Sequence, residues 1–403
     1  MYSYEEVMTY CREEDVKFIR LAFCDPSGRQ KNIAIMPAEL ERAFRYGISF
    51  DASAIPGFGD EARSDLFLFP DPSTLAVLPW RPAQGRVVRM FCGICRPDGS
   101  PFPKDNRRLL KLAAAAAEEM GVSCSFGVEF EFYLFRTDEN GDPTRIPFDQ
   151  AGYMDIAPED RGENIRREIC LTLESMGIQP ESSHHEEGPG QNEIDFRYSD
   201  PLTAADDAVT FQAVVRTIAM QNGLAACFSP KPLPGQSGNG LHINMSIKSA
   251  GGLADRHAFM AGILEHIREI TYFLNPSEES YLRLGERKAP EYVTWSSENR
   301  SQLIRVPAAK GPYVRFELRS PDPTANPYIA YALLIYAGLD GIRRQLPLPE
   351  PVNLNLFTAD RSVTQNLERL PSSLEEARDL ALQSPFIRQY MPEILEGRST
   401  VSD

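Results

Sequence analysis

The sequence lacks the segments that would carry it into or across a membrane. Its first residues, Met1 to Glu6, are polar and acidic, whereas a signal segment begins with basic residues followed by an apolar stretch. The longest apolar run, around Tyr328 to Leu339, is shorter than the roughly 20 residues that span a bilayer. We therefore expect a cytoplasmic protein.

Positive charge is also scarce. The 403 residues include 42 lysines and arginines against 57 aspartates and glutamates, which gives a net charge of -15 at pH 7. Nucleic acids and anionic membrane surfaces both require a basic protein surface, so neither is expected as a partner. With 42% hydrophobic and 25% charged residues, the chain is long enough to bury a sizeable core, and we expect two domains.

The cysteines and glycines form none of the familiar cofactor motifs. Seven cysteines, an odd number scattered among apolar residues, indicate reduced thiols and no disulfide framework. Cys92 and Cys95 form a single CxxC, which we interpret as two thiols near a strand end. There is no Walker A or GxGxxG pattern, and the glycines from Gly235 to Gly240 fit neither. A bound nucleotide would have to be held by metals and arginines.

Turn residues and hydrophobic periodicity divide the chain into short elements. We expect the first hundred residues to form strands and one helix, followed by a boundary near Pro97 to Pro103. The expected elements are a hairpin from 16–23 and 31–35, a helix at 37–46, a loop at 50–59, a strand at 64–72, helices at 106–120, 161–176 and 200–222, and an extended segment at 224–228.

The chain is organised around the run from Val128 to Phe132. In a strand, Glu129 and Glu131 point to one face and the two phenylalanines to the other. If the phenylalanine face is core, two neighbouring carboxylates need a cation or shared protons to offset their repulsion, and a hard divalent metal suits them. Taken alone, the run could equally be a strand with a solvated glutamate face.

Three further runs extend this chemistry. In 184–196, a Gly-Pro-Gly turn could bring Glu193 back towards Glu186, although the run could also be a polar surface hairpin. His242 follows a glycine-rich stretch and could be structural. In 315–319, Glu317 shares a strand face with two arginines, which suits a polyanionic substrate such as a triphosphate unless the strand is exposed. Together these runs supply the groups needed for metal-assisted phosphoryl transfer.

The sequences VEFEF at 128–132, HHEEGPGQNEIDF at 184–196, GNGLHIN at 238–244, NRSQLIRVP at 299–307 and RFELRSPDPTANPY at 315–328 occur in an order and spacing that resemble the glutamine synthetase family, bacterial type I. The resemblance covers nearly the whole chain. It implies an α+β fold with an N-terminal β-grasp domain at 1–102 and a catalytic α/β domain at 103–403 on a curved antiparallel sheet. It also implies a double-hexamer ring whose active sites lie between subunits.

The resemblance further implies ligation of ammonia to the γ-carboxylate of L-glutamate through γ-glutamyl phosphate, with ATP as co-substrate. By position, one Mg2+ or Mn2+ would be held by Glu131, Glu186 and Glu193, and a second by Glu129, His242 and Glu317. The remaining matched positions are nucleotide and phosphate contacts at Glu181, Ser246, Arg300, Arg305 and Arg315, glutamate contacts at Gly238, Arg283 and Arg319, and Asp51, which would bind ammonium and take its proton across the subunit interface.

The sequence departs from the family in the flap that covers the site. Where the family has RLVPGYEAP or similar, this chain has the shorter RLGERKAP, which places Lys288 at the position of the flap glutamate. A lysine would repel ammonium, or pair with an anionic intermediate. Glu286 or Glu291 could replace the missing carboxylate. Ser237 stands where the family has asparagine, and Phe357 where adenylylated members have tyrosine, so that modification is not expected.

The leading hypothesis is therefore glutamine synthesis by a short form with an altered flap. The first alternative is a γ-glutamyl ligase that uses another amine, such as a polyamine, which the changes at Lys288 and Ser237 motivate. The second alternative is a catalytically weak homologue with a regulatory role, against which the full metal and arginine sets argue.

Overall fold

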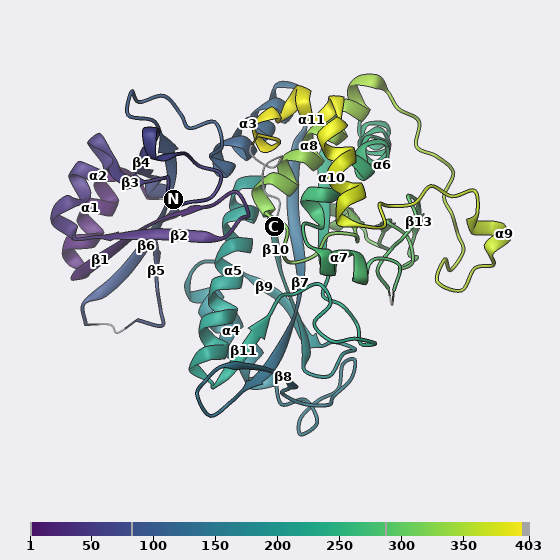
Figure 1. The fold of residues 1–403 in the computed structure, drawn as a ribbon, viewed down its shortest axis with the longest axis horizontal. Coiled ribbons are helices and arrows are strands. Elements are labelled where there is room, and N and C mark those ends of the chain that lie inside the picture. The colour runs from purple at the N-terminus through teal and green to yellow at the C-terminus, as the bar shows by residue number, and fades with distance from the viewer. Residues whose placement is uncertain (1, 82–83, 287, 397–403) are drawn as a thin grey trace.

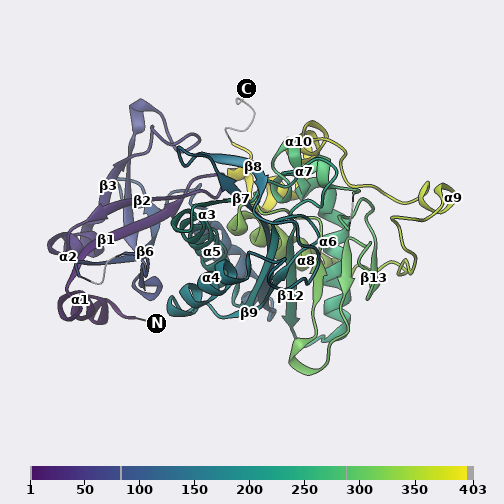
Figure 2. The same cartoon turned by 90° about the horizontal axis from the view of Figure 1, so that it is seen from below.

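The computed structural model describes residues 2–81, 84–286 and 288–396. The chain forms two sheets, one near the N-terminus and a larger one built from the rest of the chain (Figure 1). Helices α3, α4 and α5 lie between the two sheets in both views (Figures 1 and 2). The larger sheet carries most of the predicted site residues.

The N-terminal sheet has the strand order β2-β1-β6-β4-β3, with β5 beside β6. The β1–β6 pair is parallel and the other pairs are antiparallel. The predicted hairpin is confirmed as the antiparallel pair β1–β2. The strands are β1 (Val16–Cys24), β2 (Gln30–Ile35), β3 (Ile48–Asp51), β4 (Asp65–Pro70), β5 (Ala76–Val77) and β6 (Arg86–Cys95).

The expectation of one helix in this region is wrong. Helix α2 (Leu40–Tyr46) follows a 3-10 turn at Pro37–Glu39, as the periodicity predicts, but α1 (Tyr4–Glu13) precedes the first strand. Ser3 begins α1 with a capping box, in which its hydroxyl accepts from the Glu6 amide and the Glu6 carboxylate accepts from the Ser3 amide. Further 3-10 turns lie at Glu61–Arg63 and Pro72–Thr74.

The larger sheet has the strand order β13-β14-β15-β12-β7-β10-β9, and β8 and β11 also pair with β7. All pairs are antiparallel except β13–β14, so the expectation of an antiparallel sheet is confirmed apart from this edge. The strands are β7 (Ser123–Thr137), β8 (Pro143–Pro147), β9 (Pro180–His185), β10 (Gln191–Ser199), β11 (Leu224–Cys227), β12 (Leu241–Lys248), β13 (Trp295–Ser297), β14 (Ile304–Val306) and β15 (Phe316–Leu318).

Helices cover the apolar face of this sheet. The Phe130 ring stacks 4.8 Å from Phe211 of α5, and Phe126 stacks 4.6 Å from Tyr331 of α8. No helix in the described part of the chain is both long and apolar enough to cross a membrane. The helices are α3 (Asn106–Glu119), α4 (Glu163–Ser175), α5 (Pro201–Gln221), α6 (Leu253–Leu274), α7 (Glu278–Arg283), α8 (Pro327–Arg344), α9 (Arg361–Thr364), α10 (Leu374–Gln383) and α11 (Pro385–Tyr390), with 3-10 turns at Gly311–Tyr313 and Pro392–Ile394.

Arg107 of α3 joins the N-terminal sheet to the helix layer. Its guanidinium lies 2.8 Å from Asp71, which follows β4, and 2.9 Å from Asp206 of α5. Burial alone would lower the pKa of Arg107, but the charge and hydrogen bonds of Asp206 raise it above its usual value. The N-terminal sheet and the helix layer therefore meet through a buried charged contact as well as through apolar packing.

Candidate active site

Four neighbouring strands bring five of the six predicted metal ligands together. In the antiparallel pairs, Glu193 of β10 lies directly opposite Glu131 of β7, and His242 of β12 lies opposite Glu129. Asn244, two residues after His242, lies opposite Glu317 of β15. Cross-strand partners, and residues two apart on one strand, share a face of the sheet. The register alone therefore places all of these side chains on one face.

The apolar residues on the opposite face of the sheet determine which side of β7 is polar. Phe130 and Phe132, which alternate with the two glutamates on β7, are almost fully buried against the helices. A slip of one residue in register would turn the phenylalanines towards the polar face and the glutamates into the core. The alternation in 128–132 thus determines the position of both carboxylates.

One compact cluster contains Glu129, His242 and Glu317. One potential ligand atom from each lies within 4.8 Å of the others. His242 Nδ1 is 3.1 Å from Glu129 and 3.6 Å from Glu317. Glu129 also accepts a hydrogen bond of 2.9 Å from the Asn244 amide. Two carboxylates and an imidazole at this separation form a suitable site for a divalent cation.

A second group of carboxylates adjoins the first. Glu131, Glu193 and His242 have potential ligand atoms within 4.8 Å of one another. The same holds for His184, Glu186 and Glu193. The Gly-Pro-Gly turn makes the predicted reversal, because the Glu186 amide donates to the Gln191 carbonyl across it. Glu131 is held in place by the Gly240 amide, 2.8 Å away.

The electrostatics of this face suit a cation. Burial and the nearby Glu131 charge raise the pKa of Glu186 to about 7, and burial with four neighbouring carboxylates raises the pKa of Glu193 well above its usual value. Burial acts to raise the pKa of Glu129, but hydrogen bonds and charge from His242 outweigh it and lower the pKa to about 2. The excess negative charge and the oxygen-rich donor set therefore fit divalent metal ions.

Between about pH 5 and pH 8 the metal-free protein is expected to lose stability as the pH rises. The pKa values of Glu186 and Asp195 in the folded protein, about 7 and about 8, exceed those of the same groups in an unfolded chain. The folded state therefore binds more protons in this window, and its stabilisation is lost as they leave. Asp207 of α5, whose pKa burial raises to about 7, adds to the loss.

Added Mg2+ or Mn2+ should restore more stability at pH 8 than at pH 5.5. A ligand at 100 times its Kd stabilises a protein by about 2.7 kcal/mol. The loss of stability that is due to Asp207 should remain when metal is added. Asp207 lies on α5, outside the carboxylate clusters that would bind the ion. Denaturant unfolding at both pH values, with and without metal, measures the effect. Equal stability of the metal-free protein at the two pH values would contradict this prediction.

Three of the predicted arginines, Arg305, Arg315 and Arg319, lie around these clusters. Arg305 of β14 donates to Glu317 at 2.7 Å, and Arg319 donates to the same carboxylate from the other side. Arg315 donates from Nε to the Asn244 side chain at 2.8 Å. Glu317 is fully buried between these groups. The strand face therefore combines carboxylates with guanidinium groups that can bind an anionic substrate.

Arg283, at the end of α7, is buried against the glycine-rich segment. Its guanidinium donates to the Ser320 carbonyl at 2.8 Å and to the Arg319 carbonyl at 3.2 Å. A Cβ atom on Gly238 would lie 2.4 Å from the Pro230 carbonyl oxygen and 2.9 Å from Arg283 Cγ. Gly238 thus lets the backbone pass close to Arg283, and the two predicted substrate contacts are neighbours.

A small pocket of about 110 Å3 brings three of the five predicted nucleotide contacts together. Glu181, Ser246 and Arg315 all line it, along with Glu129 of the metal cluster. Glu181 is on β9 and Ser246 on β12, so the pocket spans the neighbouring strands β9, β10, β7 and β12 of the larger sheet.

Three predicted residues lie outside this arrangement. Asp51 ends β3 in the N-terminal sheet, is exposed, and accepts from the amide and hydroxyl of Ser53. Arg300 is exposed between β13 and β14 and makes no hydrogen bond or ion pair with any described residue. Lys288 has a left-handed backbone with φ of 65°, and its Nζ lies 2.6 Å from Glu187.

The two glutamates considered as flap replacements are already paired. Glu286 lies 2.6 Å from Lys231, and Glu291 lies 2.7 Å from Arg369. Neither carboxylate is part of the clusters on the sheet face. The acid nearest to Lys288 is instead Glu187, which directly follows Glu186 in the β9–β10 turn.

Sequence reasoning assigned no role to three polar side chains on this face. Asp195 lies opposite Glu129 and accepts from Ser182, and its pKa is raised to about 8 by burial and by Glu129. His184 Nε2 is 3.1 Å from Glu193, and Asn244 links Glu129 to Arg315. The sequence does indicate Asp195, because it follows Glu193 by two residues on one strand and therefore lies on the same face of the sheet.

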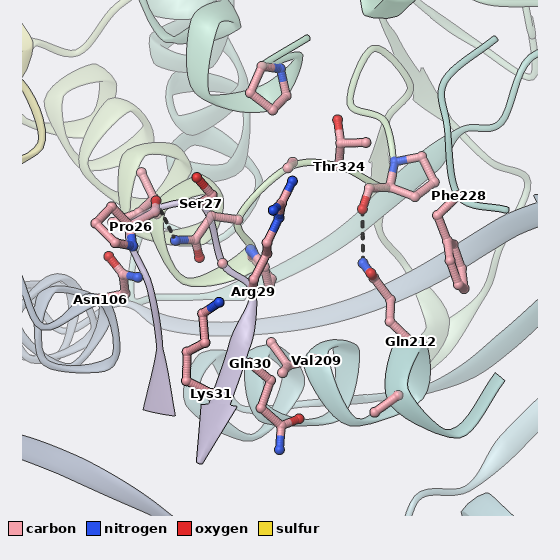
Figure 3. A pocket seen from close by; sticks show the side chains of 18 of the residues that line it. Pro26, Ser27, Arg29, Gln30, Lys31, Asn106, Val209, Gln212, Phe228 and Thr324 are labelled. Atoms are coloured by element: carbon pink, nitrogen blue, oxygen red, sulfur yellow. Dashed lines mark hydrogen bonds between the residues drawn. The ribbon is translucent and has the colours of Figure 1, made fainter. Parts of the chain in front are cut away.

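A larger cavity lies elsewhere. A volume of about 1570 Å3 opens between the β1–β2 turn, α5 and the segment before α8, and none of the predicted site residues lines it. Figure 3 shows Arg29, Lys31 and Gln212 among the residues that line it, and the Gln212 amide donates to the Pro323 carbonyl at 2.9 Å. Predicted site residues therefore line the smaller pocket and not this cavity.

Comparisons with known proteins agree with this arrangement. The family model for the β-grasp domain of glutamine synthetase matches residues 15–97, and the model for its catalytic domain matches residues 103–396. A glutamine synthetase of Clostridium saccharobutylicum is 46% identical over 98% of this chain and 93% of its own length. One of Methanosarcina mazei is 45% identical over 96% of this chain and 90% of its own length.

Solved structures show the same fold. The complex of GmaS with ADP is 28% identical and has a TM-score of 0.88, with 97% of this chain and 93% of the other covered. GmaS without ligand has a TM-score of 0.87 with the same coverage. The two family models, the full-length relatives and the shared fold together show that this chain belongs to the glutamine synthetase family of carbon–nitrogen ligases.

Proposed function

We propose that this protein joins ammonia to the γ-carboxylate of L-glutamate at the expense of ATP, giving glutamine, ADP and phosphate. The observation that carries the proposal is the single sheet face on which four strands present carboxylates, one imidazole and arginines in register. The relatives named glutamine synthetase, 41–46% identical over nearly the full chain, favour this reaction over other amine acceptors.

Two groups of residues would hold divalent cations, Mg2+ or Mn2+. Glu131, Glu186 and Glu193 form the first group, and Glu129, His242 and Glu317 form the second. When bound, the cations would offset the negative charge of the ATP phosphates. Arg300, Arg305 and Arg315 would hold the phosphates, and Glu181 and Ser246 the rest of the nucleotide in the pocket that they share with Arg315.

The reaction has two group transfers. First, a γ-carboxylate oxygen of glutamate attacks the γ-phosphorus of ATP, and the bond from phosphorus to the ADP oxygen breaks. Next, the ammonia nitrogen attacks the γ-carbonyl carbon, phosphate leaves with the electrons of the carbon–oxygen bond, and the nitrogen gives up one proton to the departing phosphate. Arg319 and Arg283 would orient glutamate beside Gly238, and Arg319 would stabilise the charge of the acyl phosphate.

Ammonium must lose a proton before its nitrogen can attack. We assign this proton to Asp51, whose carboxylate is exposed and whose pKa is lowered by hydrogen bonds from Ser53. Because Asp51 lies on the N-terminal sheet, away from the clusters on the larger sheet, we propose that it serves the site of a neighbouring subunit in a homo-oligomer, a double-hexamer ring.

ADP release tests the proposed function directly. Purified protein with Mg2+, ATP and glutamate is expected to release ADP when ammonium is added and to release little without an amine. Release only with a polyamine or another amine would instead support the alternative γ-glutamyl ligase. No release with any amine, despite nucleotide binding, would support the regulatory homologue.

Replacing Lys288 by methionine is expected to lower KM for ammonium and leave KM for ATP unchanged. Lys288 neutralises Glu187 beside the metal carboxylates, and it adds positive charge near the expected ammonium site. Partly exposed ion pairs contribute up to about 1 kcal/mol, so the change should be about twofold to fivefold. Steady-state kinetics with each substrate varied measures it. Lys231→Met, at a second flap ion pair, is the matched control, and an unchanged or raised KM for ammonium in Lys288→Met would argue against this role.

A further inference from the structure

A fully buried ion pair lies beneath the turn that carries Glu186. His185 ends β9, directly before Glu186, and its side chain is 0% exposed. Its Nε2 lies 2.9 Å from Asp149 Oδ1, and its Nδ1 lies 2.7 Å from the backbone carbonyl oxygen of Glu186. The ring therefore contacts one carboxylate and one carbonyl.

Hydrogen bonds hold this pair in one arrangement. Asp149 accepts from the backbone amides of Arg161 and Gly190, each at 3.0 Å. The two ring nitrogens of His185 lie within hydrogen-bond distance of two oxygens, one of Asp149 and one of the Glu186 backbone. Such a pair in the interior is strongly directional and costly to disturb.

The pair holds both ends of the turn. His185 fixes the carbonyl of Glu186 at the start, and Asp149 fixes the amide of Gly190 at the end. The segment between them leads directly into β10, where Glu193 is the third residue. Gly190 has φ of 71°, and a Cβ there would lie 2.8 Å from the Leu134 carbonyl, so the turn is pressed closely against β7.

The turn needs such an anchor because its own charges oppose it. Glu186 and Glu193 both lie close to Glu131, and the repulsion among the three carboxylates favours moving them apart. The sheet hydrogen bonds fix Glu193, but Glu186 lies just beyond β9. Its backbone is held by the Gln191 carbonyl, which accepts from the Glu186 amide, and by the contacts of His185 and Asp149 at the two ends of the turn.

The same residues do not form a metal site of their own. Asp149, Asp160 and His185 do have potential ligand atoms within 4.8 Å of one another. However, Asp160 is paired with the buried Arg166, and Asp149 is paired with His185. Arg166 also donates to Asn192 at 2.6 Å, next to Glu193. Both acids are thus already matched by protein cations, which leaves no excess negative charge for a metal ion.

We propose that His185 and Asp149 are positioning residues that set the affinity of the Glu131, Glu186 and Glu193 site for its divalent cation. This inference rests on the proposed function, since it takes that site to bind a metal. The two residues do not contact the cation. They act by holding the Glu186 backbone at the distance that the other two ligands require.

The chain contains a matched control for this pair. His266 of α6 is 7% exposed, and it contacts Asp340 of α8 at 2.9 Å and Glu269 at 2.7 Å. It is therefore a second buried histidine in contact with carboxylates, located among helices and away from the turn. Asp149→Asn and Asp340→Asn remove the same charge from the same kind of contact, so their general effects on stability should be similar.

Direct Mn2+ titration of the purified full-length protein, without ATP or glutamate, tests the proposal. The unmodified protein should show two sites. Asp149→Asn should weaken one of them about 10- to 100-fold, the usual effect of losing a group that orients a metal ligand, and leave the other unchanged. Asp340→Asn should leave both unchanged. Glu193→Gln identifies the affected site, because Asp149→Asn should cause no further weakening in that background.

Other results would overturn the proposal. Unaltered Mn2+ binding by Asp149→Asn would show that the pair has only a structural role. Equal weakening of both sites, or the same effect in Asp340→Asn, would lead to the same conclusion. If Asp149→Asn does not fold, His185→Gln provides the same test, because it retains one donor towards Asp149 and gives up the bond to Glu186. Failure of the unmodified protein to bind Mn2+ would instead overturn the metal site of the proposed function, and this inference with it.

Discussion

Replacing Glu193 by glutamine is expected to lower kcat/KM for glutamine formation about 100- to 1,000-fold, the range for removing one group that stabilises transition-state charge. Glu193 is directly opposite Glu131 and belongs to both clusters that would form the first cation site. The amide of glutamine keeps the size of the side chain but not its charge. The loss should appear in kcat as well as in the metal concentration needed for half-maximal rate.

The same substitution should make the metal-free protein more stable at pH 8. Burial and neighbouring carboxylates raise the pKa of Glu193 in the folded protein, so its ionised form is disfavoured there relative to the unfolded chain. Because the raised pKa means that the carboxyl group holds its proton at low pH, the gain should vanish near pH 5. Denaturant unfolding without metal measures the change in stability, and the rate of ADP formation measures the loss of activity.

Glu265→Gln is the control for this variant. Glu265 pairs with Arg344 on the surface, where its side chain is 51% exposed, and exposed pairs contribute little. Neither the rate nor the stability should change in this variant. A Glu193→Gln protein that loses stability without metal, or that retains full activity, would mean that Glu193 does not face an excess of negative charge.

The local part of the fold could be predicted from the sequence. The alternation of glutamate and phenylalanine in 128–132 determines which face of β7 is polar, and Gly-Pro-Gly in the 184–196 run predicts the reversal between β9 and β10. Both depend on residues close together in the chain. Helix α1 was missed even though Ser3 and Glu6 have the spacing of a capping box, because Val7 and Cys11 are its only buried residues and give little periodicity.

Contacts between distant segments could not be predicted from residue patterns. Asp149 and His185 are 36 residues apart, and Lys288 meets Glu187 through a flap whose course depends on packing. Motifs do not give strand register, so the position of Glu317 opposite Asn244 became known only in the folded sheet. The family resemblance supplied the expected ligand sets, and the structure adds the groups that hold these ligands in place.

Replacing Glu317 by glutamine should lower both activity and stability, in contrast to Glu193→Gln. Glu317 is fully buried, accepts from Arg305 at 2.7 Å and from Arg319, and lies 3.6 Å from His242. Without its charge, two guanidinium groups would face each other in the interior. Removing one partner of a buried ion pair typically costs about 3–5 kcal/mol, so the denaturation midpoint without metal should fall clearly.

Comparison of Glu193→Gln with Glu317→Gln distinguishes a glutamate that faces other carboxylates from one that faces arginines on the same face of the sheet. Both glutamates are predicted cation ligands, and each changes to the same amide, so ADP formation should fall by about 100-fold or more in both. Only the sign of the stability change in the metal-free protein should differ, because Glu193 faces carboxylates and Glu317 faces arginines. If both variants gained stability, the arginines would not depend on Glu317 for their charge balance. If both lost it, the repulsion among the carboxylates would be too weak to require a metal ion, and the cation sites on this face would lose their main physical support.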